Sequence, residues 1–313
     1  MNAEIPASLA DERIDRVVAM LCGLTRGQAA GLVAAGAVHL DGRPVIVRSR
    51  RVATGDLIDV ISPEPTASVE LTGDPEVSFK VVYADSDLVV IDKPAGLVVH
   101  PGPGHSHQTL VHGLLARFPE MAVVGPFDRP GIVHRLDAGT SGLMVAARSH
   151  KAYSSFVGQL AERQMGRQYL ALVNDHFAAP SGEIDAPVGR SGRRRTAMAV
   201  TSGGRPARTG YQVRVQYHQP RPLALVECRL MSGRTHQIRV HLAAIGHSVV
   251  GDTTYGRRSG DGDLLARPFL HAWRLSFQHP TSGAAMVFES DLPGDLEALL
   301  CSLECENAKD GMK

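Results

Sequence analysis

The stretch PGIVHRLDAGTSGLMV, residues 130–145, places a guanidinium and a carboxylate among residues that are otherwise mostly apolar or small. If this stretch is extended, alternation puts Arg135 and Asp137 on one face and Leu136 on the other. Its apolar flanks place it near the core, where Asp137 loses its charge unless a cation or hydrogen-bond donors stabilise it. A charged carboxylate in such a place predicts either a structural ion pair or a nucleophile.

A second cluster, SGRTHQIR at residues 232–239, contains the kind of cation that Asp137 requires. It stands at the start of a predicted helix, whose first N–H groups also favour a nearby anion. Pairing of the two clusters would keep Asp137 ionised inside the protein. The residues by themselves leave the structural bridge and the catalytic carboxylate both open.

Other common chemistries lack the residues that they need. The chain has no phosphate-binding P-loop, and GTSG around Ser141 does not match the G-x-S-x-G of a nucleophile elbow. A small-molecule hydrolase that uses His134 and Ser141 stays open as a third interpretation. His236 and His241 are five residues apart, which misses the spacing of a helical metal site. The four cysteines complete neither a zinc site nor a disulfide framework, so we expect no metal.

The composition indicates a globular protein with one large domain or two unequal ones. Of the 313 residues, 43% are hydrophobic and 21% are charged. No apolar run approaches the roughly 18 residues of a membrane span, and the polar first residues do not resemble a secretory signal. Cysteines without a disulfide pattern are typical of a reducing compartment, so we expect a cytoplasmic protein with no membrane partner.

The net charge of +1 argues against a broadly basic protein but conceals a local excess of cations. Residues 186–214 contain seven arginines and no acidic residue, and three of the arginines are consecutive at positions 193–195. A solvated loop is one explanation of this segment. A polyanionic partner explains its length better, because arginines form salt-sensitive contacts with phosphates.

The first part of the chain predicts a small module of two helices and a hairpin. Apolar residues recur at helical spacing, and the pair Asp41-Gly42 between two β-branched runs is a strong hairpin signal. A strand follows at 56–61. We assign residues 11–61 to this module and the residues 62–76, rich in Pro, Ser, Thr and acid, to a linker.

Residues 77–300 predict an α+β domain with a mixed, largely antiparallel central sheet and flanking helices. Strands come in consecutive runs with isolated helices between them, rather than in regular strand–helix repeats. Expected strands cover 79–83, 88–92, 97–100, 143–149, 167–173, 211–218 and 223–231, and expected helices cover 108–118, 150–164 and 233–246. Residues 301–313 are expected to form a terminal tail.

Five motifs stand in a fixed order along the chain: IDKPAGLVVHPG, HRLDAGTSGLMV, SGRTHQIRVHL, GDTTYG and FLHAWRLSFQHP. Over residues 11–295 the chain resembles bacterial pseudouridine synthases of the RluA/RluD type, and the first module is similar to the S4 RNA-binding domain that often precedes them. The resemblance implies the pseudouridine synthase fold behind a small α/β S4-like domain. It also implies isomerisation of uridine in RNA, with 23S ribosomal RNA as the expected substrate, and requires no metal or organic cofactor. The C1′–N1 bond breaks, the base rotates and a C1′–C5 bond forms; a monomer is the simplest expectation.

The resemblance also implies roles for individual residues. Asp137 is the catalytic aspartate, which attacks the sugar or the base or assists a deprotonation once the base is flipped out. Arg234 is the arginine that pairs with it, and Tyr169 packs on the flipped base. Residues expected to contact the nucleotide or the RNA are His134, Arg135, Thr140, Ile238, Arg26, Arg193, Arg194 and Arg195. The chain departs from the family's common pattern at Ala138 and Arg167, where lysines are frequent.

An RNA-binding factor that associates with the ribosome and has no activity is the alternative interpretation. It would share the S4-like module and the arginine-rich segment, so these features do not discriminate. The joint presence of Asp137, Tyr169 and Arg234 favours the enzyme.

Overall fold

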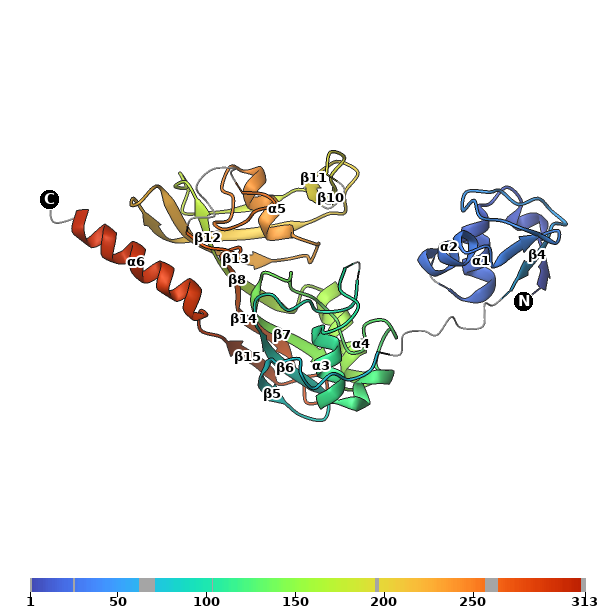
Figure 1. The fold of residues 1–313 in the computed structure, drawn as a ribbon, viewed down its shortest axis with the longest axis horizontal. Coiled ribbons are helices and arrows are strands. Elements are labelled where there is room, and N and C mark those ends of the chain that lie inside the picture. Colours follow the sequence, from blue (N-terminus) through green and yellow to red (C-terminus); the bar gives the residue numbers. More distant parts are fainter. Residues whose placement is uncertain are drawn as a thin grey trace. The chain divides into compact units, whose positions relative to one another are not determined.

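The computed structural model describes residues 2–24, 26–61, 71–102, 104–194, 197–256 and 264–310 (Figure 1). The chain forms two compact units, residues 1–70 and 71–313. In the described ranges no helix combines the length and the apolar character that crossing a membrane requires.

The smaller unit packs helices on a four-stranded antiparallel sheet. Its elements are β1 (Asn2–Glu4), η1 (Ala7–Leu9), α1 (Ile14–Cys22), α2 (Arg26–Ala34), β2 (Val38–Leu40), β3 (Arg43–Pro44) and β4 (Leu57–Val60), with strand order β1-β4-β2-β3. Ile14, Val17 and Val18 repeat at helical spacing in α1 and are fully buried. The predicted hairpin is confirmed, because Asp41 and Gly42 have the positive φ values, 52° and 76°, of a tight turn between β2 and β3.

Some features of the smaller unit lie beyond the predicted module. Strand β1 precedes residue 11, the predicted start, and pairs with β4. Arg26, which is predicted to contact RNA, begins α2. The described part of the chain includes its backbone but not its side chain. The predicted linker falls partly outside that part, at residues 62–70, while Leu71 already packs on the core of the larger unit.

The larger unit is built on one mixed sheet. Its strands are β5 (Lys80–Ala84), β6 (Leu88–Lys93), β7 (Ser141–Ala147), β8 (Gly166–Asn174), β9 (Ser181–Asp185), β12 (Arg208–Tyr217), β13 (Leu223–Leu230), β14 (Leu270–Gln278) and β15 (Ala285–Glu289). They follow the order β5-β6-β7-β14-β8-β13-β12-β9, with β15 paired to β14. All neighbours are antiparallel except β7 and β14. The predicted α+β class with a mixed, largely antiparallel sheet is confirmed.

Helices cover both faces of this sheet. They are α3 (Leu110–Arg117), η2 (Pro119–Val123), α4 (His150–Ala161), α5 (Gln237–Ala244) and α6 (Gly294–Asp310), and a small hairpin joins β10 (Val188–Arg190) to β11 (Met198–Val200) (Figure 1). Val89 and Ile91 of β6 face a core shared with α3, α5 and α6, whereas Leu88 and Val90 face a second core with α4. Burial on both faces explains the uninterrupted apolar runs 88–91 in β6 and 143–147 in β7.

Two segments differ from the expectation. Residues 97–100 were expected to form a strand, but their backbone instead accepts hydrogen bonds at Val98 and Val99 from the first residues of α3. The apolar run is therefore buried by a helix start rather than by a sheet neighbour. The stretch expected to be a tail, 301–313, includes the end of α6, whose Leu303 is buried in the core.

Strand β14 lies in the middle of the large sheet, between β7 and β8. Its first residues, His271 and Ala272, pair in parallel with β7, and Arg274 onward pairs with β15. Its other edge pairs with β8. The loop before β7, which contains Asp137, and the strand β8, which contains Tyr169, are thereby held on either side of β14.

Candidate active site

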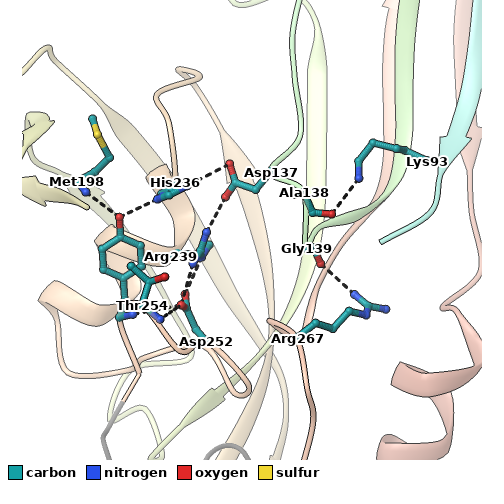
Figure 2. A network of polar contacts seen from close by, with 11 residues as sticks. Lys93, Asp137, Ala138, Gly139, Met198, His236, Arg239, Asp252, Thr254 and Arg267 are labelled. Atoms are coloured by element: carbon teal, nitrogen blue, oxygen red, sulfur yellow. Dashed lines mark hydrogen bonds and ion pairs between the residues drawn. The ribbon is translucent and has the colours of Figure 1, made fainter. Parts of the chain in front are cut away.

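Arg239 of α5 joins Asp137 to Asp252 (Figure 2). Its Nη1 donates to Asp137 Oδ2 at 3.1 Å, while Nε and Nη2 donate to the two Asp252 oxygens at 2.6 and 2.8 Å. Asp252 is buried, and this two-pronged geometry is the strong form of an arginine–carboxylate pair. Burial opposes the charge of Arg239, but its bonds to Asp252 and Asp137 outweigh burial and raise its pKa. Asp137 therefore faces a permanent cation.

The prediction that Arg234 pairs with Asp137 is wrong. Arg234 lies before α5, where its Nε donates to the carbonyl oxygen of Pro206 at 3.1 Å. The two arginines of the SGRTHQIR motif are separated by His236, whose left-handed backbone, with φ of 57°, turns the chain immediately before the helix. This turn directs Arg239, on the first turn of α5, towards Asp137. The sequence signal was present, because Arg239 stands in the same motif and Asp252 in GDTTYG.

His236 approaches the second oxygen of Asp137. Tyr255 Oη accepts a hydrogen bond from the Met198 N–H at 2.8 Å, so its own hydroxyl hydrogen is directed to His236 Nδ1, also at 2.8 Å. Burial lowers the pKa of His236 and keeps the ring neutral, with its hydrogen on Nε2. That nitrogen lies 3.9 Å from Asp137 Oδ1, beyond hydrogen-bond length. Oδ1 thus keeps capacity to interact with a bound molecule.

Two basic side chains, buried Lys93 and half-buried Arg267, hold the loop behind Asp137 through its backbone carbonyls (Figure 2). Lys93, at the end of β6, donates to the carbonyl of Ala138 at 3.2 Å and to two carbonyls of its own turn. Arg267 donates to the carbonyl of Gly139 at 3.3 Å. Burial lowers the pKa of Lys93 to about 7, although the charge of Asp137 acts in the opposite direction. Lys93 is a positioning residue that the sequence analysis did not single out.

A small pocket of about 40 Å³ lies beside Asp137. Tyr169, Thr140 and Ile238 line it together with Asp137 and Arg239, so the structure brings together most of the residues predicted for the reacting nucleotide. Tyr169 is buried on β8, and burial raises the pKa of its hydroxyl to about 12. The pocket thus combines a carboxylate paired with an arginine, a neutral phenol and an apolar wall.

A larger cavity of about 830 Å³ adjoins this pocket and shares Asp137 and Tyr169 with it. The arginines that line it are Arg129, Arg135, Arg163, Arg167, Arg205, Arg208 and Arg234. Among the described residues of its lining, the carboxylates are those of Asp137 and Asp185. An excess of guanidinium groups around a concave surface attracts a polyanion.

His134 and Arg135 both line the larger cavity but have different surroundings. Arg135 is exposed, and its Nη1 lies 3.1 Å from His100 Nε2. His134 has a buried ring whose Nε2 accepts a hydrogen bond from the Val145 N–H at 3.2 Å. Burial, helped by the charge of Arg167, lowers the pKa of His134 to about 3, so the ring is neutral.

Comparison with known protein families identifies the family of this chain. Residues 87–244 match the family model described as RNA pseudouridylate synthase, and residues 12–58 match that of the S4 domain. The chain belongs to the RNA pseudouridine synthase family.

Relatives of this synthase match it over nearly its whole length. The ribosomal large subunit pseudouridine synthase D of Nitrosomonas europaea is 41% identical over 95% of this chain and 86% of its own. A protein of Chloroflexus aurantiacus named as an RNA pseudouridine synthase is 45% identical over 96% of this chain and 92% of its own. The solved structure of human RNA pseudouridylate synthase domain containing 1 is 30% identical, covers 71% of this chain and 88% of its own, and has a TM-score of 0.58. The protein is thus an enzyme that isomerises uridine in RNA, and none of these likenesses supports the inactive alternative.

The arginine-rich segment of the synthase is partly balanced by acids from outside it. Arg208 pairs with Asp185 at 2.6 Å, and Arg214 pairs with Glu227. In the loop between β10 and β11, Arg194 donates to the carbonyl of Thr254 at 2.9 Å, which ties this loop to the turn that contains Asp252. Arg193 is exposed in the same loop, and Arg195 lies outside the described residues.

Ser141 has no part in a hydrolytic dyad with His134. Its Oγ bonds instead to His271 Nδ1 at 3.0 Å, and both side chains are buried where β7 meets β14. Among the described residues no three His, Cys, Asp or Glu side chains form a group that could hold a metal ion.

Proposed function

We propose that this synthase modifies uridines of large-subunit ribosomal RNA. Several relatives that match it over most of its length are named ribosomal large subunit pseudouridine synthases. The observation that carries the catalytic assignment is the position of Asp137, which is paired with Arg239 at the junction of a small pocket and an arginine-lined cavity. The flipped uridine lies where the smaller pocket opens into the larger cavity, beside Asp137 and Tyr169, and the rest of the larger cavity receives the surrounding RNA.

Asp137 is the catalytic residue of this proposal. The reaction breaks C1′–N1 and forms C1′–C5, and the hydrogen on C5 is lost while N1 gains one. Attack on the sugar, attack on the base and removal of a proton all require an ionised carboxylate oxygen. Arg239 binds Oδ2, and His236 is too far from Oδ1 for a hydrogen bond, which leaves Oδ1 for the nucleotide.

Tyr169 packs against the uracil and stays protonated during the reaction. With a pKa of about 12, its hydroxyl keeps its proton at neutral pH, so it can donate a hydrogen bond but cannot act as a phenolate base. Ile238 and Thr140 line the same pocket and bound the base on its remaining sides.

Extrusion of the uridine requires contacts on the rest of the RNA. Arg135, exposed beside the pocket, occupies the space that the base leaves in the stack, with His134 next to it. Arg26, Arg193, Arg194 and Arg195 supply further contacts to phosphates. In this proposal residues 11–61 form the S4-like RNA-binding domain, residues 77–300 catalyse the reaction, and the protein acts as a monomer in the cytoplasm.

Pseudouridine mapping tests this function. Transcribed large-subunit ribosomal RNA is incubated with wild-type protein and with Asp137→Asn, and transfer RNA serves as the competing substrate. We expect pseudouridine at defined ribosomal positions with wild type, and a loss of at least about a hundredfold in rate with the variant. Product on transfer RNA alone would contradict the ribosomal assignment, and full activity of Asp137→Asn would contradict the catalytic one. Binding without product on either RNA would favour the inactive factor.

A further inference from the structure

Arg167 is a buried guanidinium that has no partner in the described part of the chain. It is 8% exposed, on β8, and burial lowers its pKa. Its Nε has no hydrogen-bond partner, and no described carboxylate lies within ion-pair distance of the group. Arginine is almost never buried without a partner, because removal of its charge from water is costly. The buried, unpaired guanidinium of Arg167 is therefore energetically unfavourable in the protein without a ligand.

The side chain of Arg167 belongs to the lining of the larger cavity. Because Arg167 and Tyr169 are two residues apart on one strand, their side chains share a face of the sheet. Gly233 leaves room for the guanidinium, since a Cβ at that position would lie 2.8 Å from Arg167 Nη1. An anion held by Arg167 would thus lie next to the pocket that contains Tyr169.

Two histidines add unpaired donors to the same cavity. His134 Nε2 accepts from the Val145 N–H, so the neutral ring carries its hydrogen on Nδ1, which is buried without a partner. His100 Nε2 faces the Arg135 guanidinium, which can only donate, so its hydrogen is also on Nδ1, again buried and unpaired. Arg167, His134 and His100 all line the cavity, and the buried polar atoms that they leave unpaired, Arg167 Nε and the two Nδ1 atoms, are donors.

We propose that Arg167, with the Nδ1–H of His134, binds a phosphate group that flanks the flipped uridine. The inference rests on the proposed function and assigns a specific subsite within it. A guanidinium presents donors in a planar fork that matches two phosphate oxygens, and the anion supplies the charge that Arg167 lacks. The subsite fixes the backbone of the same nucleotide whose base packs on Tyr169.

Nucleotide binding without turnover tests the subsite. Dissociation constants of uridine, uridine 5′-monophosphate and uridine 3′-monophosphate are measured by calorimetry for wild type, Arg167→Met and Arg229→Met. Arg229 is the matched control because it is exposed on β13 opposite Gln168, on the other face of the sheet. We expect one monophosphate to bind wild type and Arg229→Met about tenfold more tightly than uridine, and Arg167→Met to lose this preference. Arg167→Lys keeps the charge but not the planar fork, so its preference for the monophosphate should lie between those of wild type and Arg167→Met.

Thermal unfolding without RNA separates this binding role from a structural one. Since the guanidinium is buried unpaired, Arg167→Met should unfold at the same temperature as wild type or a higher one. A lower unfolding temperature would assign Arg167 to the fold and overturn the proposal. An equal loss of affinity for uridine would make a uracil oxygen the acceptor, and absence of any preference for a monophosphate in wild type would remove the phosphate site. These measurements need no product, so failure of the proposed activity would be seen separately in pseudouridine mapping.

Discussion

Arg239 and Asp137 meet across 102 positions of the chain, with 3.1 Å between Nη1 and Oδ2. The guanidinium cannot turn away from this contact without breaking its two bonds to buried Asp252. The orientation of the proposed catalytic carboxylate therefore depends on α5 and on the turn that follows it. A substitution in α5 or in that turn should therefore alter the orientation of Asp137 even if the substituted residue does not contact RNA.

Arg239→Lys and Arg234→Lys form a matched pair of variants. A lysine at position 239 keeps the charge but lacks the three separate nitrogens with which the guanidinium spans Asp252 and Asp137, so Asp137 loses its fixed position. We expect its rate of pseudouridine formation to fall about a hundredfold. Arg234→Lys should lower mainly the affinity for RNA, because the Arg234 guanidinium bonds to the backbone carbonyl of Pro206 and not to Asp137. Single-turnover rates and binding curves on one RNA measure the rate and the affinity. A larger rate loss for Arg234→Lys than for Arg239→Lys would support Arg234 as the partner of Asp137, as the resemblance implies.

Tyr169→Phe isolates the hydroxyl from the ring. The ring still packs in the pocket, so RNA affinity should stay within about threefold, while the rate falls by about a hundredfold if the phenol donates in the transition state. Because the pKa of Tyr169 is about 12, the wild-type rate should show no step near pH 10, where an ordinary tyrosine ionises. A rate step near pH 10 that disappears in Tyr169→Phe would contradict the burial-driven shift.

His134 makes stability depend on pH on the acidic side. Its pKa of about 3 in the folded protein lies below the ordinary value of about 6.5, so between these values the unfolded chain binds a proton that the folded one does not. The contribution of the neutral His134 to the unfolding free energy is therefore complete above pH 6.5, and it is lost as the pH falls below that value. From pH 6.5 to 5 we expect wild type to lose about 2 kcal/mol more unfolding free energy than His134→Gln. Urea unfolding at several pH values measures the difference, and parallel slopes for the two proteins would contradict it.

Gly142→Ala tests the close approach of β7 and β14. Gly142 has φ of 111°, and a Cβ there would lie 2.3 Å from the carbonyl oxygen of Ala272. Backbone strain and overlap together should lower the unfolding free energy by more than about 3 kcal/mol. Gly246→Ala is the control, since Gly246 has φ of 94° but no atom within 4 Å of the added Cβ. A similar loss in both variants would show that only the backbone conformation matters.

Elements with a strong local pattern were predictable from the sequence. Helix α1 and the Asp41-Gly42 hairpin follow from spacing and turn chemistry within a few residues. Strand β14 was not predicted: residues 273–278 alternate between apolar and polar side chains, but Leu270, His271 and Ala272 before them are all buried, and the strand is defined by its pairing with β7, β8 and β15. Residues 97–100 show the converse error, since an apolar run can be buried without pairing.

The sequence by itself determined the family and the α+β class, and it singled out Asp137 as the proposed catalytic carboxylate, because these rest on motifs contained in short segments. Only the tertiary structure decided which arginine holds Asp137. Arg234 and Arg239 stand in one motif and carry the same charge, and neither segment encodes its distance to residue 137. The left-handed backbone of His236 and the burial of Asp252 bring Arg239 to the carboxylate, and such a contact exists only once the strands and α5 are packed.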